Sequence, residues 1–189
     1  MHSANIKWWT RVARLYPGLF RQRRVLEVGS RWLNGSVRDF FKGCDYTGLD
    51  WRAGPCVDVV SLAHEMAFDQ PFDVIISASM LEHDPYWSKS LTAMVAHLNT
   101  HGALLLSWGS AENQPHDHAS APDGQFHPLP AGRVLQALEV LGLYVEQFVY
   151  EANIDKRGGW GECGLVAFQD QSDGLGATRI SRLRKADRL

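Results

Sequence analysis

Short runs of apolar residues alternate with helix-like stretches along most of this chain. The clearest run is Phe72–Ser77 (F-D-V-I-I-S), which follows Pro71 and fits no helical stripe. Comparable runs at Arg24–Val28 and Ala103–Trp108 predict two more buried strands. Strands and helices that alternate in this way are typical of a parallel sheet covered by helices.

Further elements of both kinds complete the alternation. The expected helices are Asn5–Tyr16, Gly35–Phe41, a segment from Asp84 to about Leu98, and Ala131–Leu141. The remaining expected strands are Tyr46–Asp50, Val57–Val60, Tyr144–Tyr150 and Cys163–Gln169, the last two forming a hairpin. We therefore predict an α/β fold of the Rossmann-like, doubly wound type, with a mostly parallel seven-stranded sheet and an antiparallel C-terminal hairpin strand.

The same pattern predicts one domain over residues 1–170. Residues 1–20 contain its N-terminal helix, and the polar stretch 109–130, rich in Pro and His, is long enough to be an active-site loop. Apolar periodicity ends near Asp170, so the basic tail 171–189 is either disordered or docked as a short helix.

Composition excludes several classes of protein. The three cysteines form no C-x-x-C pair, which argues against a disulfide framework and a cysteine zinc site. No stretch approaches the roughly 20 apolar residues of a membrane span, and Lys7, Trp8 and Trp9 stand where a signal peptide has its apolar run. We therefore expect a cytoplasmic protein with no membrane partner.

The formal net charge of −2 conceals an excess of Lys and Arg at both ends of the chain. Residues 1–24 hold six Lys/Arg and no acid, and residues 176–189 hold five Lys/Arg against Asp187, which leaves the middle strongly acidic. Such ends are either solvated surfaces or sites for nucleic acid, a phosphorylated substrate or an acidic partner. The tryptophans available for base stacking would be Trp8, Trp9, Trp51, Trp87 and Trp108.

Candidate chemistry gathers in the loops that follow the predicted strands. Glu27 ends the first strand, Gly29 lies in the following turn, and Asp50 closes the second strand 21 residues beyond Gly29. Backbone can approach a ligand closely at Gly, and a strand-end carboxylate can accept both ribose hydroxyls. A dinucleotide would also require G-x-G-x-x-G, whereas Gly29 and Gly35 are six apart and Glu27 adds a negative charge. The pattern therefore favours S-adenosylmethionine, which has no phosphate and is cationic.

These loops resemble those of class I S-adenosylmethionine-dependent methyltransferases of the small, type-11-like branch. The resemblance covers roughly Val25–Trp108 through V-L-E-V-G-S…N-G-S, Y-T-G-L-D, V-D-V-V and F-D-V-I-I-S-A-S-M-L-E-H. The first loop departs from the common E-x-G-x-G-x-G, because Arg31 and Asn34 belong to a longer connection.

The resemblance implies a set of cofactor-binding residues. These are Glu27, Gly29 and Ser30 at the methionine part, Asp50 on the ribose, Trp51, Leu62 and Ala63 at the adenine, and Ser79 and Met80 in the wall. Structural alternatives stay open for three of them. Asp50 is a common turn residue, Glu27 can pair with Arg24 or Arg31, and Trp51 can pack in the core.

A general base is required only where the methyl acceptor must lose a proton. The catalytic candidates are His83 after the fourth strand and His116 or His118 in the long loop. In L-E-H-D-P, the alternative is that Glu82 or Asp84 caps the next helix while His83 only orients the loop.

The long loop also suggests a metal site, because imidazole and carboxylate at H-D-H spacing can bind zinc or iron. Its candidates are His116, Asp117, His118, Asp123 and His127. Since H-x-H alone is a frequent accident, and the resemblance implies a loop that encloses substrate, we expect no metal.

The expected activity is S-adenosylmethionine-dependent transfer of a methyl group to an oxygen or nitrogen of a small-molecule or exposed acceptor. Two alternatives stay open. A nucleic-acid methyltransferase is favoured by the basic ends but opposed by the acidic middle and by S-A-S-M in place of an N-P-P-Y-type tetrad. A noncatalytic cofactor-binding or scaffold subunit is suggested by the irregular first loop.

Overall fold

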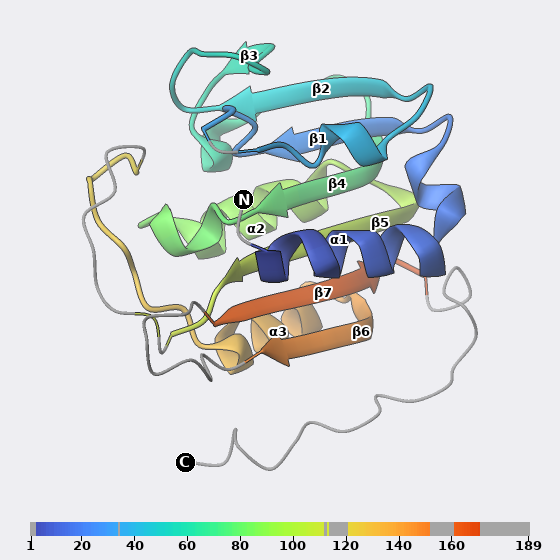
Figure 1. The fold of residues 1–189 in the computed structure, drawn as a ribbon. Helices are drawn as coiled ribbons and strands as arrows, with labels where there is room; N and C mark the ends of the chain where they lie inside the picture. Colours follow the sequence, from blue (N-terminus) through green and yellow to red (C-terminus); the bar gives the residue numbers. More distant parts are fainter. Residues whose placement is uncertain (1–2, 34, 112, 114–120, 152–160, 171–189) are drawn as a thin grey trace.

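A seven-stranded sheet forms the centre of the computed structural model, which describes residues 3–33, 35–111, 113, 121–151 and 161–170 (Figure 1). The strands are β1 (Arg24–Val28), β2 (Asp45–Asp50), β3 (Val59–Val60), β4 (Phe72–Ala78), β5 (Leu98–Gly109), β6 (Tyr144–Glu151) and β7 (Glu162–Phe168). Their order across the sheet is β3-β2-β1-β4-β5-β7-β6. Among these strands β7 alone runs in the opposite direction, so it is antiparallel to β5 and to β6, and the other pairs are parallel. The predicted fold class is therefore confirmed.

Helices cover both faces of this sheet. The α-helices are α1 (Ser3–Leu15), α2 (Trp87–Ala96) and α3 (Ala131–Val140), and the 3-10 helices are η1 (Pro17–Phe20), η2 (Arg38–Phe40), η3 (Ala63–Glu65) and η4 (Leu81–His83). Figure 1 shows α1 on one face and α2 and α3 on the other. Among the described residues, no helix combines the length and apolar character that crossing a membrane requires.

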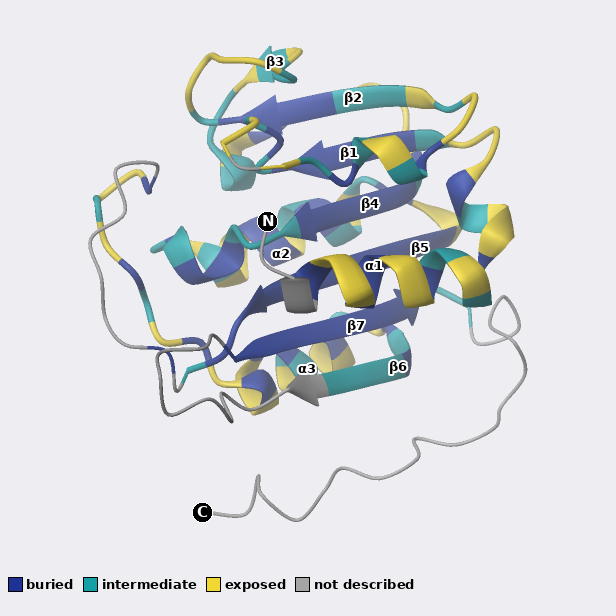
Figure 2. Cartoon of the chain, in the orientation of Figure 1, coloured by how far each residue is buried: buried dark blue, intermediate teal, exposed yellow. Residues whose placement is uncertain are grey.

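Both faces of the central strands are buried (Figure 2), which explains their continuous apolar runs. In β4, Phe72 and Ile75 pack in the core beneath α2 and α3, whereas Val74 and Ile76 pack in the core beneath α1. Trp9 of α1 is fully buried in the core beneath α1. The N-terminal helix is therefore an integral layer of the fold.

Two expected elements are shorter than predicted. Within the expected helix Gly35–Phe41 only the 3-10 helix η2 forms, and Ser36 Oγ accepts the N–H of Arg38 at its start at 3.0 Å. The expected strand Val57–Val60 retains only Val59–Val60; Asp58 is held beside β2 through two hydrogen bonds with Gly48, one from its N–H to the Gly48 carbonyl and one to its carboxylate from the Gly48 N–H, both at 2.8 Å.

The helix expected from Asp84 to about Leu98 and the strand that follows it also have other bounds than predicted. Asp84 Oδ1 accepts the N–H of Tyr86 at 2.8 Å, and Asp84 Oδ2 accepts the hydroxyl of Ser90. The chain therefore turns before α2, which begins at Trp87. Strand β5 begins at Leu98, because Leu98 pairs with Phe72 before a register irregularity in the ladder.

Candidate functional site

A cavity of about 590 Å³ opens at the carboxyl ends of the parallel strands, where the strand order reverses between β1 and β4. Open α/β sheets bind ligands at this point. Eight of the residues singled out from the sequence line the cavity together, namely Gly29, Asp50, Trp51, Leu62, Ala63, Ser79, Met80 and His83.

The turn after β1 forms one edge of the cavity. Gly29 adopts a φ of +86°, a left-handed conformation that favours glycine. The N–H groups of Gly29 and Ser30 both donate to the carbonyl of Leu49, at 2.8 and 3.0 Å. Ser30 is buried, with its side chain against Gly48, so it supports the turn and is not among the cavity-lining residues.

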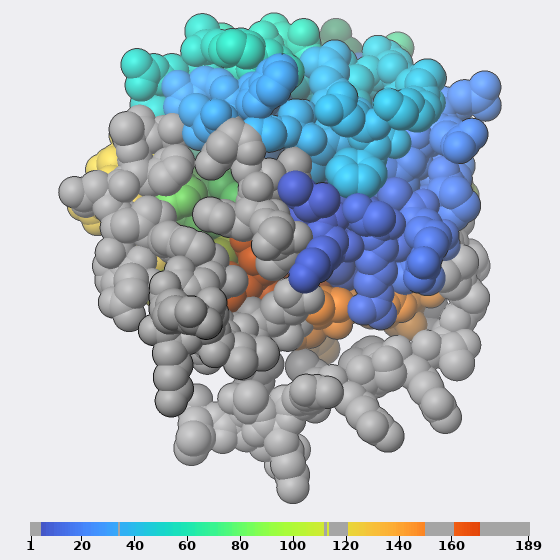
Figure 3. Space-filling model, in the orientation of Figure 1, coloured from blue at the N-terminus to red at the C-terminus, as the bar shows by residue number. Residues whose placement is uncertain are grey.

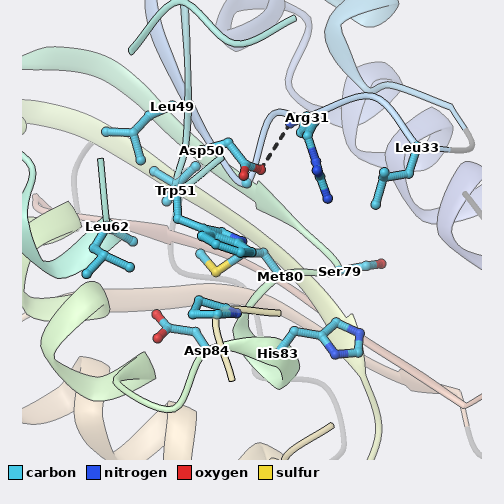
Figure 4. A pocket seen from close by; sticks show the side chains of 14 residues that line it. Arg31, Leu33, Leu49, Asp50, Trp51, Leu62, Ser79, Met80, His83 and Asp84 are labelled. Atoms are coloured by element: carbon cyan, nitrogen blue, oxygen red, sulfur yellow. Dashed lines mark hydrogen bonds between the residues drawn. The ribbon is translucent and has the colours of Figure 1, made fainter. Parts of the chain in front are cut away.

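Asp50 is held at the cavity by two backbone donors. Its Oδ2 accepts the N–H of Arg31 at 3.2 Å and its Oδ1 accepts the N–H of Arg52 at 3.0 Å (Figure 4). A carboxylate has about four acceptor positions, so each oxygen keeps capacity for one more donor. The carboxylate is therefore oriented before any ligand arrives and can accept two hydroxyl groups.

The end of β4 supplies the opposite wall and connects it to α1. Ser79 has a φ of +54°, and its N–H donates to the carbonyl of Ser107 at 2.8 Å. Its hydroxyl oxygen accepts a 2.8 Å hydrogen bond from Nδ2 of Asn5, which is 1% exposed. The first turns of the N-terminal helix thereby position a residue of the cavity wall.

The short helix η4 anchors the segment that follows residue 120. His83 Nδ1 lies 3.3 Å from the carbonyl oxygen of Gln125, and its ring packs edge-on against Phe126. Glu82 is buried; its Oε1 accepts the N–H of Gly109 at 2.7 Å and its backbone carbonyl accepts the N–H of His127. Burial raises the pKa of Glu82 to about 7, although the backbone N–H groups of Glu82 itself and of Gly109 oppose the rise.

The lining of the cavity divides into two halves. Figure 4 shows Leu49, Leu62 and Trp51 on one side together with Asp84, and Arg31, Ser79 and His83 on the other together with Leu33. The carboxylate of Asp50 lies between the two groups in this view. The arrangement suits an elongated ligand with a flat apolar end, hydroxyl groups in the middle and a charged end.

No family model matches this chain, and no curated protein matches it. Solved structures do. A Burkholderia thailandensis 1,6-didemethyltoxoflavin-N1-methyltransferase, with S-adenosylhomocysteine bound, aligns at a TM-score of 0.66 and 16% identity, covering 88% of this chain and 78% of its own. The N-methyltransferase NodS from Bradyrhizobium japonicum, also with S-adenosylhomocysteine, aligns at a TM-score of 0.62 and 15% identity, with 86% of each chain covered.

The chain has the class I methyltransferase fold. The same fold also includes the [4+2]-cyclase SpnF, which aligns at a TM-score of 0.62 and 16% identity over 88% of this chain and 82% of its own. The structural resemblance therefore confirms the fold expected from the sequence but leaves the reaction to be argued from the site.

Within this methyltransferase fold, Glu27 lies where sequence reasoning did not place it. Its carboxylate is 4% exposed, accepts a 2.7 Å hydrogen bond from the hydroxyl of Tyr46 and is not among the cavity-lining residues. Burial raises its pKa to about 7, although the Tyr46 bond opposes the rise. Arg24, one of its expected ion-pair partners, approaches Asp45 instead, at 3.7 Å.

Six lining residues were not assigned to the site from the sequence, and the charged ones among them are Arg31 and Asp84. Arg31 lies two residues after Gly29, so its position in the first loop was the available signal. Leu62 and Ala63 line the cavity, whereas Glu65 is exposed and approaches His64 at 3.9 Å.

The remaining candidates separate by burial and by position. Of the five tryptophans considered for base stacking, Trp9 and Trp108 are fully buried and Trp8 is 8% exposed, whereas Trp51 and Trp87 are half-buried. His116, Asp117 and His118 lie outside the described residues. In the part of the chain that is described, no three His, Cys, Asp or Glu side chains form a group that could hold a metal ion; Asp123 and His127 pair with each other at 2.7 Å.

Proposed function

We propose that this chain is an S-adenosylmethionine-dependent methyltransferase that acts on an oxygen or nitrogen of a small or exposed acceptor. The observation that carries the proposal is the position of the Asp50 carboxylate, which two backbone N–H groups orient between an apolar and a polar half of one cavity. The S-adenosylhomocysteine bound to two proteins of the same fold supports this choice of ligand.

The lining fits the chemical parts of S-adenosylmethionine. Trp51 and Leu62 would contact the adenine ring, and the two remaining acceptor positions of Asp50 would take the ribose hydroxyls. The guanidinium of Arg31 suits the carboxylate of the methionine part. These residues provide an apolar surface, a hydroxyl acceptor and a cation in the order in which the ligand presents its groups.

The same loop argues against a dinucleotide. Binding a pyrophosphate requires backbone N–H groups that point at it from the turn after the first strand. Here the N–H groups of Gly29 and Ser30 are already bonded to the Leu49 carbonyl. The turn therefore lacks the donors that a pyrophosphate would need at these two positions.

The chemistry asks for little beyond positioning. When bound, S-adenosylmethionine supplies an electrophilic methyl group on a cationic sulfur that leaves as a neutral thioether. Holding the acceptor in line with that methyl group is the main contribution a protein can make. In the bond to the Gln125 carbonyl, His83 Nδ1 carries the proton, so the neutral ring has its lone pair on Nε2. We propose His83 as the base wherever the acceptor must lose a proton.

The test is calorimetric titration with S-adenosylhomocysteine. Wild-type protein should bind it, and Asp50→Ala should weaken binding by about 30–100-fold, since two charged hydrogen bonds are lost. The matched control is Asp69→Ala, because Asp69 is exposed and lies before β4, away from the cavity. Absence of binding to the wild type, or equal binding by Asp50→Ala, would overturn the proposal.

Binding alone does not separate an enzyme from a noncatalytic subunit. A second measurement therefore follows the transfer of labelled methyl groups from S-adenosylmethionine to a panel of small amines and hydroxyl compounds. A methyl-transfer rate that rises with pH in the wild type and that His83→Ala lowers supports a methyltransferase with a histidine base. Tight cofactor binding with no transfer to any acceptor favours the noncatalytic alternative.

A further inference from the structure

A second cavity of about 470 Å³ lies between α1 and the strands β5, β6 and β7; we call it the α1 cavity. Residues of α1 form one side, and Ser107, Val149 and the first residues of β7 form the other. Figure 3 shows atoms of β7 beside α1 on the surface of the molecule. The α1 cavity is not part of the proposed cofactor site.

Trp8 and Gly164 shape the α1 cavity. A β-carbon on Gly164 would lie 2.5–2.8 Å from three atoms of the Trp8 indole, so only glycine lets the ring lie this close to β7. Trp8 is 8% exposed, and its Nε1–H has no hydrogen-bond partner in the structure as described. A buried donor without an acceptor is unfavourable, and a ligand oxygen would satisfy it.

The α1 cavity carries an excess of positive charge. Lys7 and Arg11 stand four residues apart on α1, both line the cavity, and both are exposed. Neither forms an ion pair or hydrogen bond among the described residues. Glu162 of β7 is the acid in the lining, so two cations face one carboxylate. Two cationic side chains and an indole N–H in the lining of one cavity are complementary to an anion.

A hydrogen bond connects a residue of the α1 cavity to a residue of the cofactor cavity. Asn5 and Ser107 line the α1 cavity, and Asn5 Nδ2 donates to the hydroxyl oxygen of Ser79, which lines the cofactor cavity. Ser79 belongs to the polar half, where the sulfur end of the cofactor is proposed to lie. A ligand in the α1 cavity would therefore be adjacent to the transferred methyl group.

We propose that the α1 cavity binds the methyl acceptor and that this acceptor carries an anionic group, a carboxylate or a phosphate. Lys7 and Arg11 hold the anion, and the Trp8 indole N–H donates to one of its oxygens or to an oxygen beside it. The acceptor role rests on the proposed methyltransferase function. The binding of an anion in the α1 cavity does not.

The test uses four probes of similar shape: benzoate, phenyl phosphate, neutral benzyl alcohol and cationic benzylamine. Binding is followed by the indole N–H signal of Trp8 in nitrogen-15 NMR spectra of the full chain, assigned through Trp8→Phe. At millimolar concentration, at least one anionic probe should move this signal saturably, and benzyl alcohol and benzylamine should not. The stronger of the two anions distinguishes a carboxylate from a phosphate acceptor.

Charge-removing variants complete the test. The double variant Lys7→Ala/Arg11→Ala should weaken anion binding at least about tenfold, and added salt should weaken it in the wild type. Arg14→Ala is the matched control, since Arg14 is exposed on the same helix but does not line the cavity. Failure of both anions to move the Trp8 signal, or equal binding by the double variant and the control, would overturn the proposal.

A parallel titration with S-adenosylhomocysteine keeps the two proposals distinguishable. If anions bind but S-adenosylhomocysteine does not, the methyltransferase function has failed, and the acceptor role fails with it while the anion site stands. If S-adenosylhomocysteine binds but anions do not, the anionic acceptor is wrong and the cofactor site stands.

Discussion

Gly29 lies so close to Met80 that a β-carbon on Gly29 would be 2.7 Å from both Cβ and Cγ of the methionine. The two residues belong to the turns after β1 and β4, the adjacent strands between which the order of the sheet reverses. Because Met80 Cβ is fixed to the backbone, it cannot easily move away. The close approach of these two turns gives the cofactor cavity its shape.

Gly29→Ala should therefore destabilise the protein by about 2–4 kcal/mol, from left-handed strain and from overlap with Met80. It should also abolish detectable binding of S-adenosylhomocysteine. Gly142→Ala is the matched control, since Gly142 has a φ of +79° but nothing within 4 Å of its β-carbon position. Urea denaturation of both variants separates the strain from the overlap. Equal losses would show that overlap with Met80 contributes nothing.

The bond between Asn5 and Ser79 predicts a measurable contribution of α1 to stability. Asn5→Ala removes a buried partner from the hydroxyls of Ser79 and Ser107, which lie 2.8 and 3.4 Å from its side chain. The free energy of unfolding should fall by about 1–3 kcal/mol. Thr10→Ala, an exposed position on the same helix, should change it by less than about 0.5 kcal/mol. Similar values for the two variants in urea denaturation would contradict this view of the helix.

Glu27 predicts a specific dependence of stability on pH. Its pKa is raised from 4.5 to about 7 by burial, so the folded state binds its proton more tightly than the unfolded state. The stabilisation is complete below pH 4.5 and is lost as pH rises through about 7. Relative to Glu27→Gln, which cannot titrate, the wild type should lose about 3 kcal/mol across this window and nothing further above it.

Tyr46→Phe provides the second arm of this measurement. The hydroxyl of Tyr46 lowers the pKa of Glu27, so removing it should extend the window to higher pH. Both variants are compared with the wild type by urea denaturation between pH 4 and 9. A difference between wild type and Glu27→Gln that stays constant with pH would show that folding does not raise the pKa of Glu27.

Trp51 should contribute to adenine binding through its ring. Trp51→Ala should weaken S-adenosylhomocysteine binding by about tenfold, the effect of losing one aromatic contact. Trp32→Ala is the control, because Trp32 is 56% exposed and is not in the cavity lining. Calorimetric titration of the two variants with S-adenosylhomocysteine measures the two affinities. An unchanged affinity of Trp51→Ala would show that Trp51 packs in the fold without contributing to adenine binding.

Much of the sheet followed from the pattern of apolar residues. Strand β1 has the predicted bounds Arg24–Val28, and the carboxyl end of β2 at Asp50 is also as predicted. Buried parallel strands must be apolar on both faces, and this leaves a strong signal in a short segment. The predicted helix Gly35–Phe41 is reduced to the single 3-10 turn Arg38–Phe40, because a segment this short has few apolar positions from which periodicity can define its ends.

The cofactor cavity was predictable to the extent that it consists of strand ends. Gly29, Asp50 and Ser79 follow strands whose carboxyl ends meet at one edge of a parallel sheet, so their proximity is a consequence of the fold class. Whether a strand-end side chain faces the cavity is a different matter. Glu27 is the last residue but one of β1, and the Tyr46 hydroxyl on the neighbouring strand holds its carboxylate in a buried position.

The sequence by itself determined the fold class, the strand ends and the residues gathered there, because periodicity and turn chemistry are local properties of the chain. Only the tertiary structure decided that Asn5 reaches Ser79, 74 residues away, and that Trp8 lies over Gly164 beside two cations. These contacts depend on how α1 packs across β7. Packing of that kind joins distant segments through shape and hydrogen bonds, and it leaves no periodic signal in either segment.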